Sequence, residues 1–174
     1  DSVMVGNFVG SNALAAVGAS SSMIYLLIAF SQGAAVGAGV IVAQYLGARN
    51  KKSVSDAVHT SLVIAGILGI VLTIAGIVLS RQLLEWMKTP EEVMEQAVTY
   101  FRLYSAGMFF GIVYNMAAGI LNAAGNSKRS LLYLAVASFT NIILDILFIA
   151  ILDMGVAGAA IATDISQAVS CILS

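Results

Sequence analysis

The sequence has 174 residues, of which 60% are hydrophobic and 10% are charged, and its formal net charge is −1. Soluble domains carry about 25% charged residues, so this chain has too few charges to cover a water-exposed surface, and lipid is expected to surround much of it. The slight negative charge argues against nucleic acid as a partner, and the single cysteine, Cys171, rules out an internal disulfide.

The first membrane crossings are expected in residues 2–48, which contain no charged residue. As one helix, this stretch would be about 70 Å long at ~1.5 Å per residue, whereas a bilayer core is about 30 Å thick. The turn-forming residues 10–12, Gly-Ser-Asn, predict a break. Residues 1–10 are then the end of a helix that begins outside this sequence, and residues 13–46 form the second helix.

Four further apolar segments follow, and polar stretches separate them. They predict helices over residues 56–80, 93–122, 130–152 and 156–174, the last of them cut off by the end of the sequence. Residues 81–95 are polar and amphipathic, and they predict a short interfacial helix with Trp86 at the headgroup level. The expected fold is an all-α integral membrane bundle of six helices over residues 1–174, with its first and last helices truncated.

Lysine and arginine residues are concentrated in two loops, residues 47–52 and 125–129. Both loops follow even-numbered crossings, so both lie on one side of the membrane. The positive-inside rule places that side in the cytoplasm and the acidic stretch 85–95 outside. The sequence therefore predicts a multi-pass protein of the plasma (inner) membrane.

Three carboxyl groups remain at membrane depth, those of Asp1, Asp145 and Asp164. A rise of ~1.5 Å per residue places all three in the outer half of the bilayer. Ionisable groups at that depth are costly and mark functional sites. Asn141 precedes Asp145 by four residues and shares its helical face, and Thr163 adds a hydroxyl group beside Asp164.

These oxygen atoms suit a hard cation or a proton, as in an ion-coupled transporter. The alternative is that Asn141 and Asp145 form only structural hydrogen bonds between helices. We favour the ion site because no basic residue lies at that depth to neutralise the carboxylates. No pair of nucleophile and base and no cluster of metal ligands is evident, so we expect no enzyme and no cofactor beyond the coupling ion, H⁺ or Na⁺.

Six segments, taken in order, resemble the multidrug and toxic compound extrusion (MATE) family. They are residues 1–6 (DSVMVG), 13–18 (ALAAVG), 44–48 (QYLGA), 125–128 (GNSK), 141–145 (NIILD) and 158–163 (GAAIAT). The resemblance implies a transporter of twelve helices in two six-helix lobes, and this chain is similar to the N-terminal lobe. It also implies export of cationic, amphipathic drugs in exchange for H⁺ or Na⁺, with membrane lipid and a C-terminal lobe as partners.

The same resemblance implies a cation site formed by Asp1, Asn141, Asp145 and Thr163. Asp164 is a possible additional member, and it departs from the family pattern, which usually has an apolar residue at that position. Two other functions stay open: a flippase for lipid-linked saccharides from the same superfamily, and a membrane subunit or receptor that transports nothing. Buried Arg and Lys side chains that bind phosphate would favour the flippase. Buried carboxyl groups argue against the subunit or receptor, because an interaction scaffold gains nothing from them.

Overall fold

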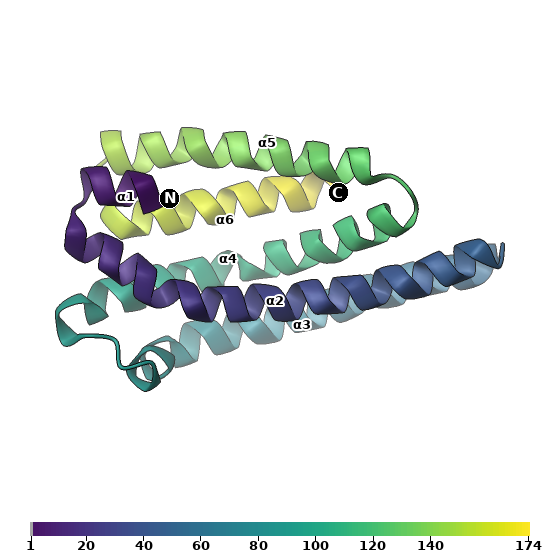
Figure 1. Ribbon diagram of the computed structural model, residues 1–174, viewed down its shortest axis with the longest axis horizontal. Helices are drawn as coiled ribbons and strands as arrows, with labels where there is room; N and C mark the ends of the chain where they lie inside the picture. The colour runs from purple at the N-terminus through teal and green to yellow at the C-terminus, as the bar shows by residue number, and fades with distance from the viewer. Residues whose placement is uncertain (1) are drawn as a thin grey trace.

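The computed structural model describes residues 2–174, and within them the chain forms a bundle of long antiparallel helices (Figure 1). In chain order, the elements are α1 (Ser2–Phe8), α2 (Ser11–Gly47), α3 (Lys51–Trp86), α4 (Glu91–Ala123), α5 (Ser127–Asp145), the π-helical segment η1 (Ile146–Ile151) and α6 (Gly155–Leu173). Five segments of the described chain, with α5 and η1 taken together, are long and apolar enough to cross a membrane. The predicted all-α membrane bundle is thereby confirmed.

The break between the first two helices lies where the sequence predicts it. α1 ends at Phe8 and α2 begins at Ser11. Between them, Gly10 adopts φ +112°, a conformation that side chains with a Cβ rarely reach and glycine adopts freely. The chain therefore turns at this point, and α1 packs back against α2 and η1.

The predicted interfacial helix over residues 81–95 is wrong, because α3 runs without interruption to Trp86. No glycine or proline interrupts the helix after Ser80, and the Leu84 side chain is fully buried in the core. Burial of Leu84 holds this last stretch in the bundle, not flat on the membrane surface. The chain turns only at Lys88, where φ is +56°, and Pro90 then precedes α4.

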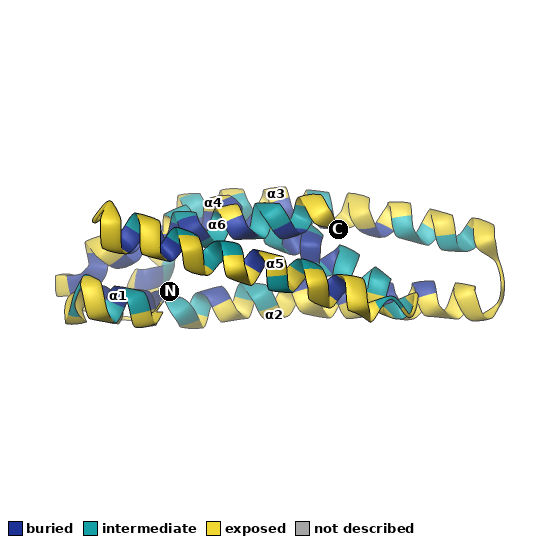
Figure 2. Ribbon diagram, turned by 90° about the horizontal axis from the view of Figure 1, so that it is seen from above, coloured by how far each residue is buried: buried dark blue, intermediate teal, exposed yellow. Residues whose placement is uncertain are grey.

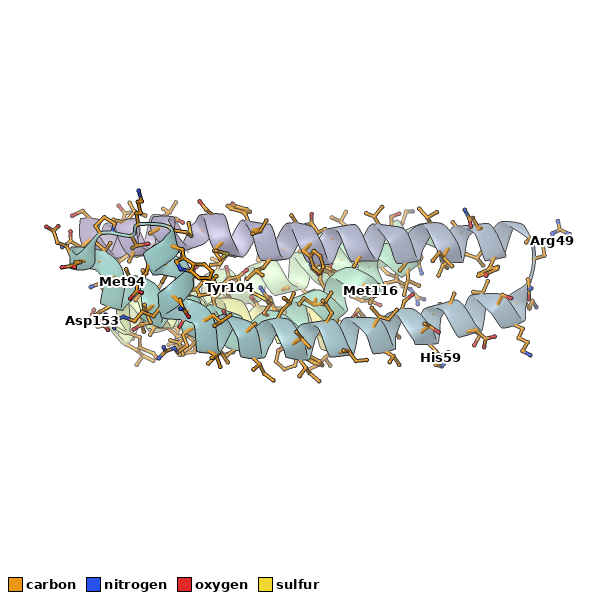
Figure 3. All side chains as sticks on the ribbon, turned by 90° about the horizontal axis from the view of Figure 1, so that it is seen from below. Arg49, His59, Met94, Tyr104, Met116 and Asp153 are labelled. Carbon is orange, nitrogen blue, oxygen red and sulfur yellow. The ribbon has the colours of Figure 1, made fainter. Side chains whose placement is uncertain are left out.

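Helix α4 lies at the centre of the bundle and contacts α2, α3, α5 and α6. The α2–α3 hairpin extends beyond the other helices at one end (Figures 1 and 2), and Figure 3 shows Arg49 at its tip. The loop between α4 and α5, which is followed by Lys128 in the first turn of α5, lies at the same end (Figure 1), while Asp153 lies at the opposite end (Figure 3). This arrangement agrees with the prediction that the two basic loops share one side of the membrane.

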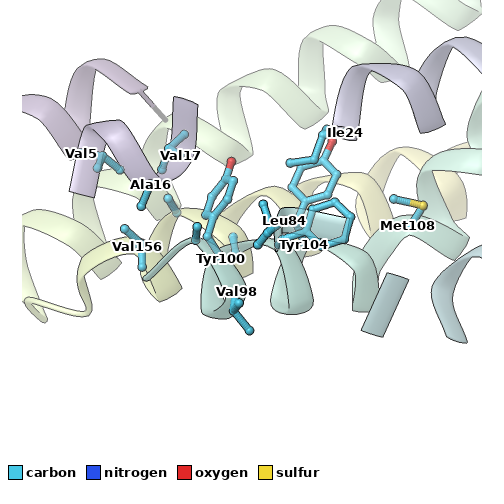
Figure 4. Close-up of a cluster of buried hydrophobic side chains, with 14 of the residues drawn as sticks. Val5, Ala16, Val17, Ile24, Leu84, Val98, Tyr100, Tyr104, Met108 and Val156 are labelled. Atoms are coloured by element: carbon cyan, nitrogen blue, oxygen red, sulfur yellow. The ribbon is translucent and has the colours of Figure 1, made fainter. Parts of the chain in front are cut away.

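The core is built where α4 meets its neighbours. Phe101 of α4, Leu84 of α3 and Val5 of α1 are each fully buried in one continuous cluster. Figure 4 shows part of this cluster, including Leu84 and Val5. Large apolar side chains such as Ile74 and Phe139, by contrast, point outward. An apolar outer surface of this kind is what a bilayer solvates, so the packing supports membrane insertion.

Candidate functional site

A polar contact joins α5 to α6 at membrane depth. Asn141 Nδ2 of α5 donates to Thr163 Oγ1 of α6 over 3.5 Å. The Thr163 hydroxyl in turn donates to the Ala159 carbonyl of its own helix at 3.1 Å. The structure thus brings together two of the four residues expected to form the cation site; their role in ion binding stays a prediction.

Asp145, the third of these residues, is the last residue of α5 and is only 2% exposed. The π-helical segment η1 begins at the next residue and contacts both α1 and α6. At the end of η1, the N–H of the following residue Leu152 donates to the Leu147 carbonyl, five residues earlier, over 3.0 Å. Such π segments are rare, and they occur frequently at functional sites. Nothing in the sequence indicates η1, because its apolar residues are typical of any buried helix.

Asp1, the fourth predicted member, lies outside the described residues. Asp164, the possible additional member, follows Thr163 directly but faces a different helix. Successive residues of an α-helix are about 100° apart, and the Asp164 carboxylate lies against Gly107 of α4. The structure therefore separates Asp164 from the contact between Asn141 and Thr163.

A cavity of about 320 Å³ lies between α2, α4, α5 and α6, beside the contact between Asn141 and Thr163. Polar groups around it include those of Ser31, Tyr104, Asn115, Asn141, Thr163 and Gln167. Asn115 Nδ2 donates to Ser31 Oγ at 3.4 Å, which links α4 to α2. Gln167 Nε2 donates to the Tyr104 hydroxyl at 3.4 Å, which links α6 to α4.

A second cavity of about 340 Å³ adjoins the first and shares Ile28, Tyr104 and Thr163 with it. Tyr25 and Tyr100 give it an aromatic wall. Tyr100 and Tyr104 lie one turn apart on α4, with ring centroids 6.1 Å apart (Figure 4). The two cavities bring polar and aromatic side chains together inside the bundle, beside apolar ones such as Leu27 and Ile28.

The sequence analysis did not single out Asn115, Gln167 or the two tyrosines of α4. Asn115 and Gln167 could have been predicted from the sequence. Asn and Gln side chains within membrane spans cost free energy unless they form hydrogen bonds. Within residues 2–174 there is also no group of three or more His, Cys, Asp or Glu side chains that could hold a metal ion.

The fold defines a class of protein: a multi-pass, all-helical membrane protein whose helices line cavities with both apolar and polar side chains, as in transporters. The MatE family model matches residues 1–147. The chain therefore belongs to the MatE family, whose members are transporters, and several of the relatives it matches are named as multidrug resistance proteins or transporters.

Curated relatives support the assignment. The probable multidrug resistance protein YpnP of Bacillus subtilis is 34% identical over 98% of this chain and 38% of its own length. The probable multidrug resistance protein NorM of Thermotoga maritima is 28% identical over 96% of this chain and 37% of its own length. The chain thus spans somewhat more than a third of each of these two relatives.

Solved structures have the same fold. A MATE transporter in the bent conformation superposes with a TM-score of 0.93 at 35% identity, over 99% of this chain and 38% of that one. An inward-facing multidrug resistance MATE transporter of the MOP superfamily gives a TM-score of 0.93 at 33% identity, over 99% and 39%. The bundle is therefore a partial lobe of such a transporter, and in a bacterium it resides in the plasma membrane.

Proposed function

We propose that the full-length protein is an antiporter that exports cationic, amphipathic compounds in exchange for H⁺ or Na⁺. A C-terminal lobe would complete it, because in two-lobe transporters the substrate path lies at the interface between the repeats. One observation carries the proposal: Asp145 is a carboxyl group with 2% exposure inside a membrane bundle. A carboxyl group at that depth is a functional site by default.

The residues around Asp145 suit a small cation. Asn141 lies one turn before it on α5, and Thr163 reaches Asn141 from α6. Amide, hydroxyl and carboxylate oxygens are the ligands that hard cations prefer, and a carboxylate also binds a proton. Asp1 is proposed as the fourth member of this site. Ion binding there would stabilise one arrangement of α5, α6 and η1, and an ion shifts a conformational equilibrium only through such a difference in affinity.

The cavities support a cationic, amphipathic substrate. Tyr100 and Tyr104 offer aromatic faces, which attract organic cations, and Met108 is a flexible apolar side chain that adapts to varied ligands. Asn115 and Gln167 add polar groups that would orient a ligand.

The charge of the cavity distinguishes this proposal from the flippase. None of the described residues that line the two cavities is Lys or Arg, whereas a phosphate-bearing lipid would require such groups. The question is relevant to this family, because one similar structure, a MOP superfamily transporter from Pyrococcus furiosus, is described as having a binding pocket of reverse polarity that suggests a different function.

The Asp145→Asn variant of the full-length protein tests the coupling role. Asparagine keeps the shape of the side chain and removes its charge and its acidic proton. The variant should reach the membrane at the level of the parent and lose coupled ethidium efflux. Efflux by the parent is measured under an imposed proton gradient and then under a sodium gradient, and the gradient that drives it identifies the ion.

Asp153→Asn is the matched control, because Asp153 is an exposed carboxylate in the turn between η1 and α6. Asparagine also tolerates its positive φ of +51°. The control should export ethidium like the parent. Normal efflux by Asp145→Asn under both gradients would show that Asp145 has only a structural role.

A further inference from the structure

One face of α4 is uncovered in the outer half of the helix, and its side chains change in character with depth in the membrane. This face is formed by residues at intervals of three or four, which lie on one side of a helix, and each of them is exposed: Glu95, Thr99, Arg102, Ala106 and Phe110. From the outer end inwards, the face carries a carboxylate, a hydroxyl group, a guanidinium, a methyl group and an aromatic ring. A phospholipid has the same order, with charged groups outside and apolar groups inside.

The guanidinium of Arg102 is held against α3 on one edge only. Arg102 Nε donates to Ser80 Oγ over 3.2 Å. Ser80 is fully buried, and its hydroxyl donates to the Ile77 carbonyl at 3.1 Å, so this acceptor has a fixed position. The two terminal nitrogens of Arg102 carry four more N–H groups. Among residues 2–174 these groups have neither a hydrogen-bond acceptor nor a carboxylate partner.

The contact with Ser80 places the guanidinium at the outer boundary of the hydrocarbon core. Residues 57–80 of α3 contain no Lys, Arg, Asp or Glu, and Arg81 follows directly. These 24 residues span about 36 Å as a helix, close to the core thickness of about 30 Å. Ser80 therefore lies where the hydrocarbon ends and the lipid headgroups begin. Phosphate oxygens are the acceptors that this layer offers to a guanidinium.

The charges just outside Arg102 have the opposite sign. Glu95 accepts a hydrogen bond from Arg81 Nη1 at 3.0 Å, and Arg81 directly follows Ser80, so adjacent residues of α3 contact Glu95 and Arg102. Arg81 also pairs with Glu85 at 3.1 Å, which gives two carboxylates for one guanidinium and leaves negative charge in excess. A positive charge is attracted to this outer group, whereas a negative charge is attracted to Arg102.

We propose that this face of α4, beside α3, binds an outer-leaflet phospholipid whose headgroup bears an ammonium group, as in phosphatidylethanolamine. The lipid phosphate accepts from the terminal nitrogens of Arg102, because a guanidinium forms two parallel hydrogen bonds with a phosphate. The ammonium group lies beside Glu95, and an acyl chain lies along Ala106 and Phe110. The site is separate from the proposed substrate path, since neither Arg102 nor Ser80 lines the two cavities.

Thermal unfolding of the purified full-length protein in detergent tests the lipid class, because a ligand that binds only the folded state raises the melting temperature. Phosphatidylethanolamine should raise it most, phosphatidylglycerol less, and inorganic phosphate not at all. An equal rise with inorganic phosphate would overturn the lipid as the occupant. Equal rises with the two lipids would overturn the contact between the ammonium group and Glu95.

Arg102→Gln tests the phosphate contact, and it should lose most of the rise caused by phosphatidylethanolamine. Arg129→Gln is the matched control, because Arg129 is also exposed but lies in the first turn of α5, at the opposite end of the bundle, and it should keep the full rise. A full rise in Arg102→Gln would overturn the proposal. If that variant also melts lower than the parent without lipid, a carboxylate of the missing lobe is the partner of Arg102.

Ser80→Ala tests whether a fixed geometry, and not charge alone, binds the lipid. The variant keeps every charge and removes the acceptor that holds Arg102 Nε, so it should reduce the rise caused by phosphatidylethanolamine. Ser61→Ala is the matched control, since Ser61 is a buried serine of the same helix far from Arg102, and its rise should match that of the parent. An undiminished rise in Ser80→Ala would reduce the site to a general attraction between charges and overturn the fixed site.

Discussion

Helices α3 and α4 cross the same bilayer side by side, yet the more hydrophobic of the two lies on the outside. The most apolar 18-residue window of α3 has a mean hydropathy of 2.9, against 1.3 for α4. Large side chains of α3 such as Ile70 and Ile74 are nevertheless exposed, whereas α4 contacts four other helices. In a soluble protein the apolar helix would be the buried one.

The difference follows from the solvent. Lipid chains are as apolar as leucine, so hydrophobicity does not draw one membrane helix towards another. Close packing and polar contacts do, and α3 buries a stripe of mostly small residues against the bundle. Its buried residues are Ser61, Ala65, Gly69, Gly76, Ser80 and Leu84. On α3, small residues mark the buried face, and large apolar residues mark the surface.

The largest effect on stability is expected from a charge on the outer face of α3. Ile70 lies near the middle of α3 and is 53% exposed, so Ile70→Arg places a guanidinium in the hydrocarbon core. The cost is about 2.5–3.5 kcal/mol by insertion scales, and the amount of full-length protein in the membrane should fall. Gln82→Arg is the control: Gln82 is exposed near the end of α3, where arginine reaches the headgroups. Equal amounts of the two variants would contradict the assignment of this face to lipid.

An intermediate effect is expected from one methyl group at the close contact between α4 and α2. A Cβ at Gly119 would lie 2.7 Å from the carbonyl oxygen of Ala35, a backbone atom that cannot rotate away. Gly119→Ala should therefore destabilise the bundle by about 1–3 kcal/mol, as overpacking does, and thermal unfolding in detergent measures this. On α3, Gly66 has nothing within 4 Å, so Gly66→Ala should be neutral or stabilising. The same melting temperature for both variants would refute the contrast between the helices.

The smallest effect is expected where α3 and α4 meet outside the hydrocarbon core. Arg81 forms ion pairs with Glu85 at 3.1 Å and with Glu95 at 3.0 Å, and all three side chains are more than half exposed. Exposed pairs contribute about 0–1 kcal/mol. Arg81→Gln should lower the melting temperature slightly at low salt and not at all at high salt. A large, salt-independent loss would mean that the ion pairs, and not the packing of α3 on α4, join these helices.

The sequence alone determined the class of protein and the course of the chain. The membrane spans, the loops and the break before Ser11 can be predicted from the order of apolar and polar residues along the chain. The length of an apolar run and the thickness of a bilayer together set the number of crossings. Asn141, Asp145 and Thr163 could be singled out for the same reason, since polar groups at membrane depth stand out against an apolar background. The resemblance to MATE transporters came from six short segments of the sequence, and the match to the MatE family model confirmed it.

Only the tertiary structure decided which helix each of these groups faces. Asp164 and Thr163 are neighbours in the sequence, yet one lies against Gly107 of α4 and the other contacts Asn141 of α5. The continuation of α3 to Trp86 depended on the burial of Leu84, and the π segment after Asp145 has no signature in its apolar residues. Hydropathy specifies the depth of a residue, but its direction depends on the rotation of its helix, which contacts with neighbouring helices set.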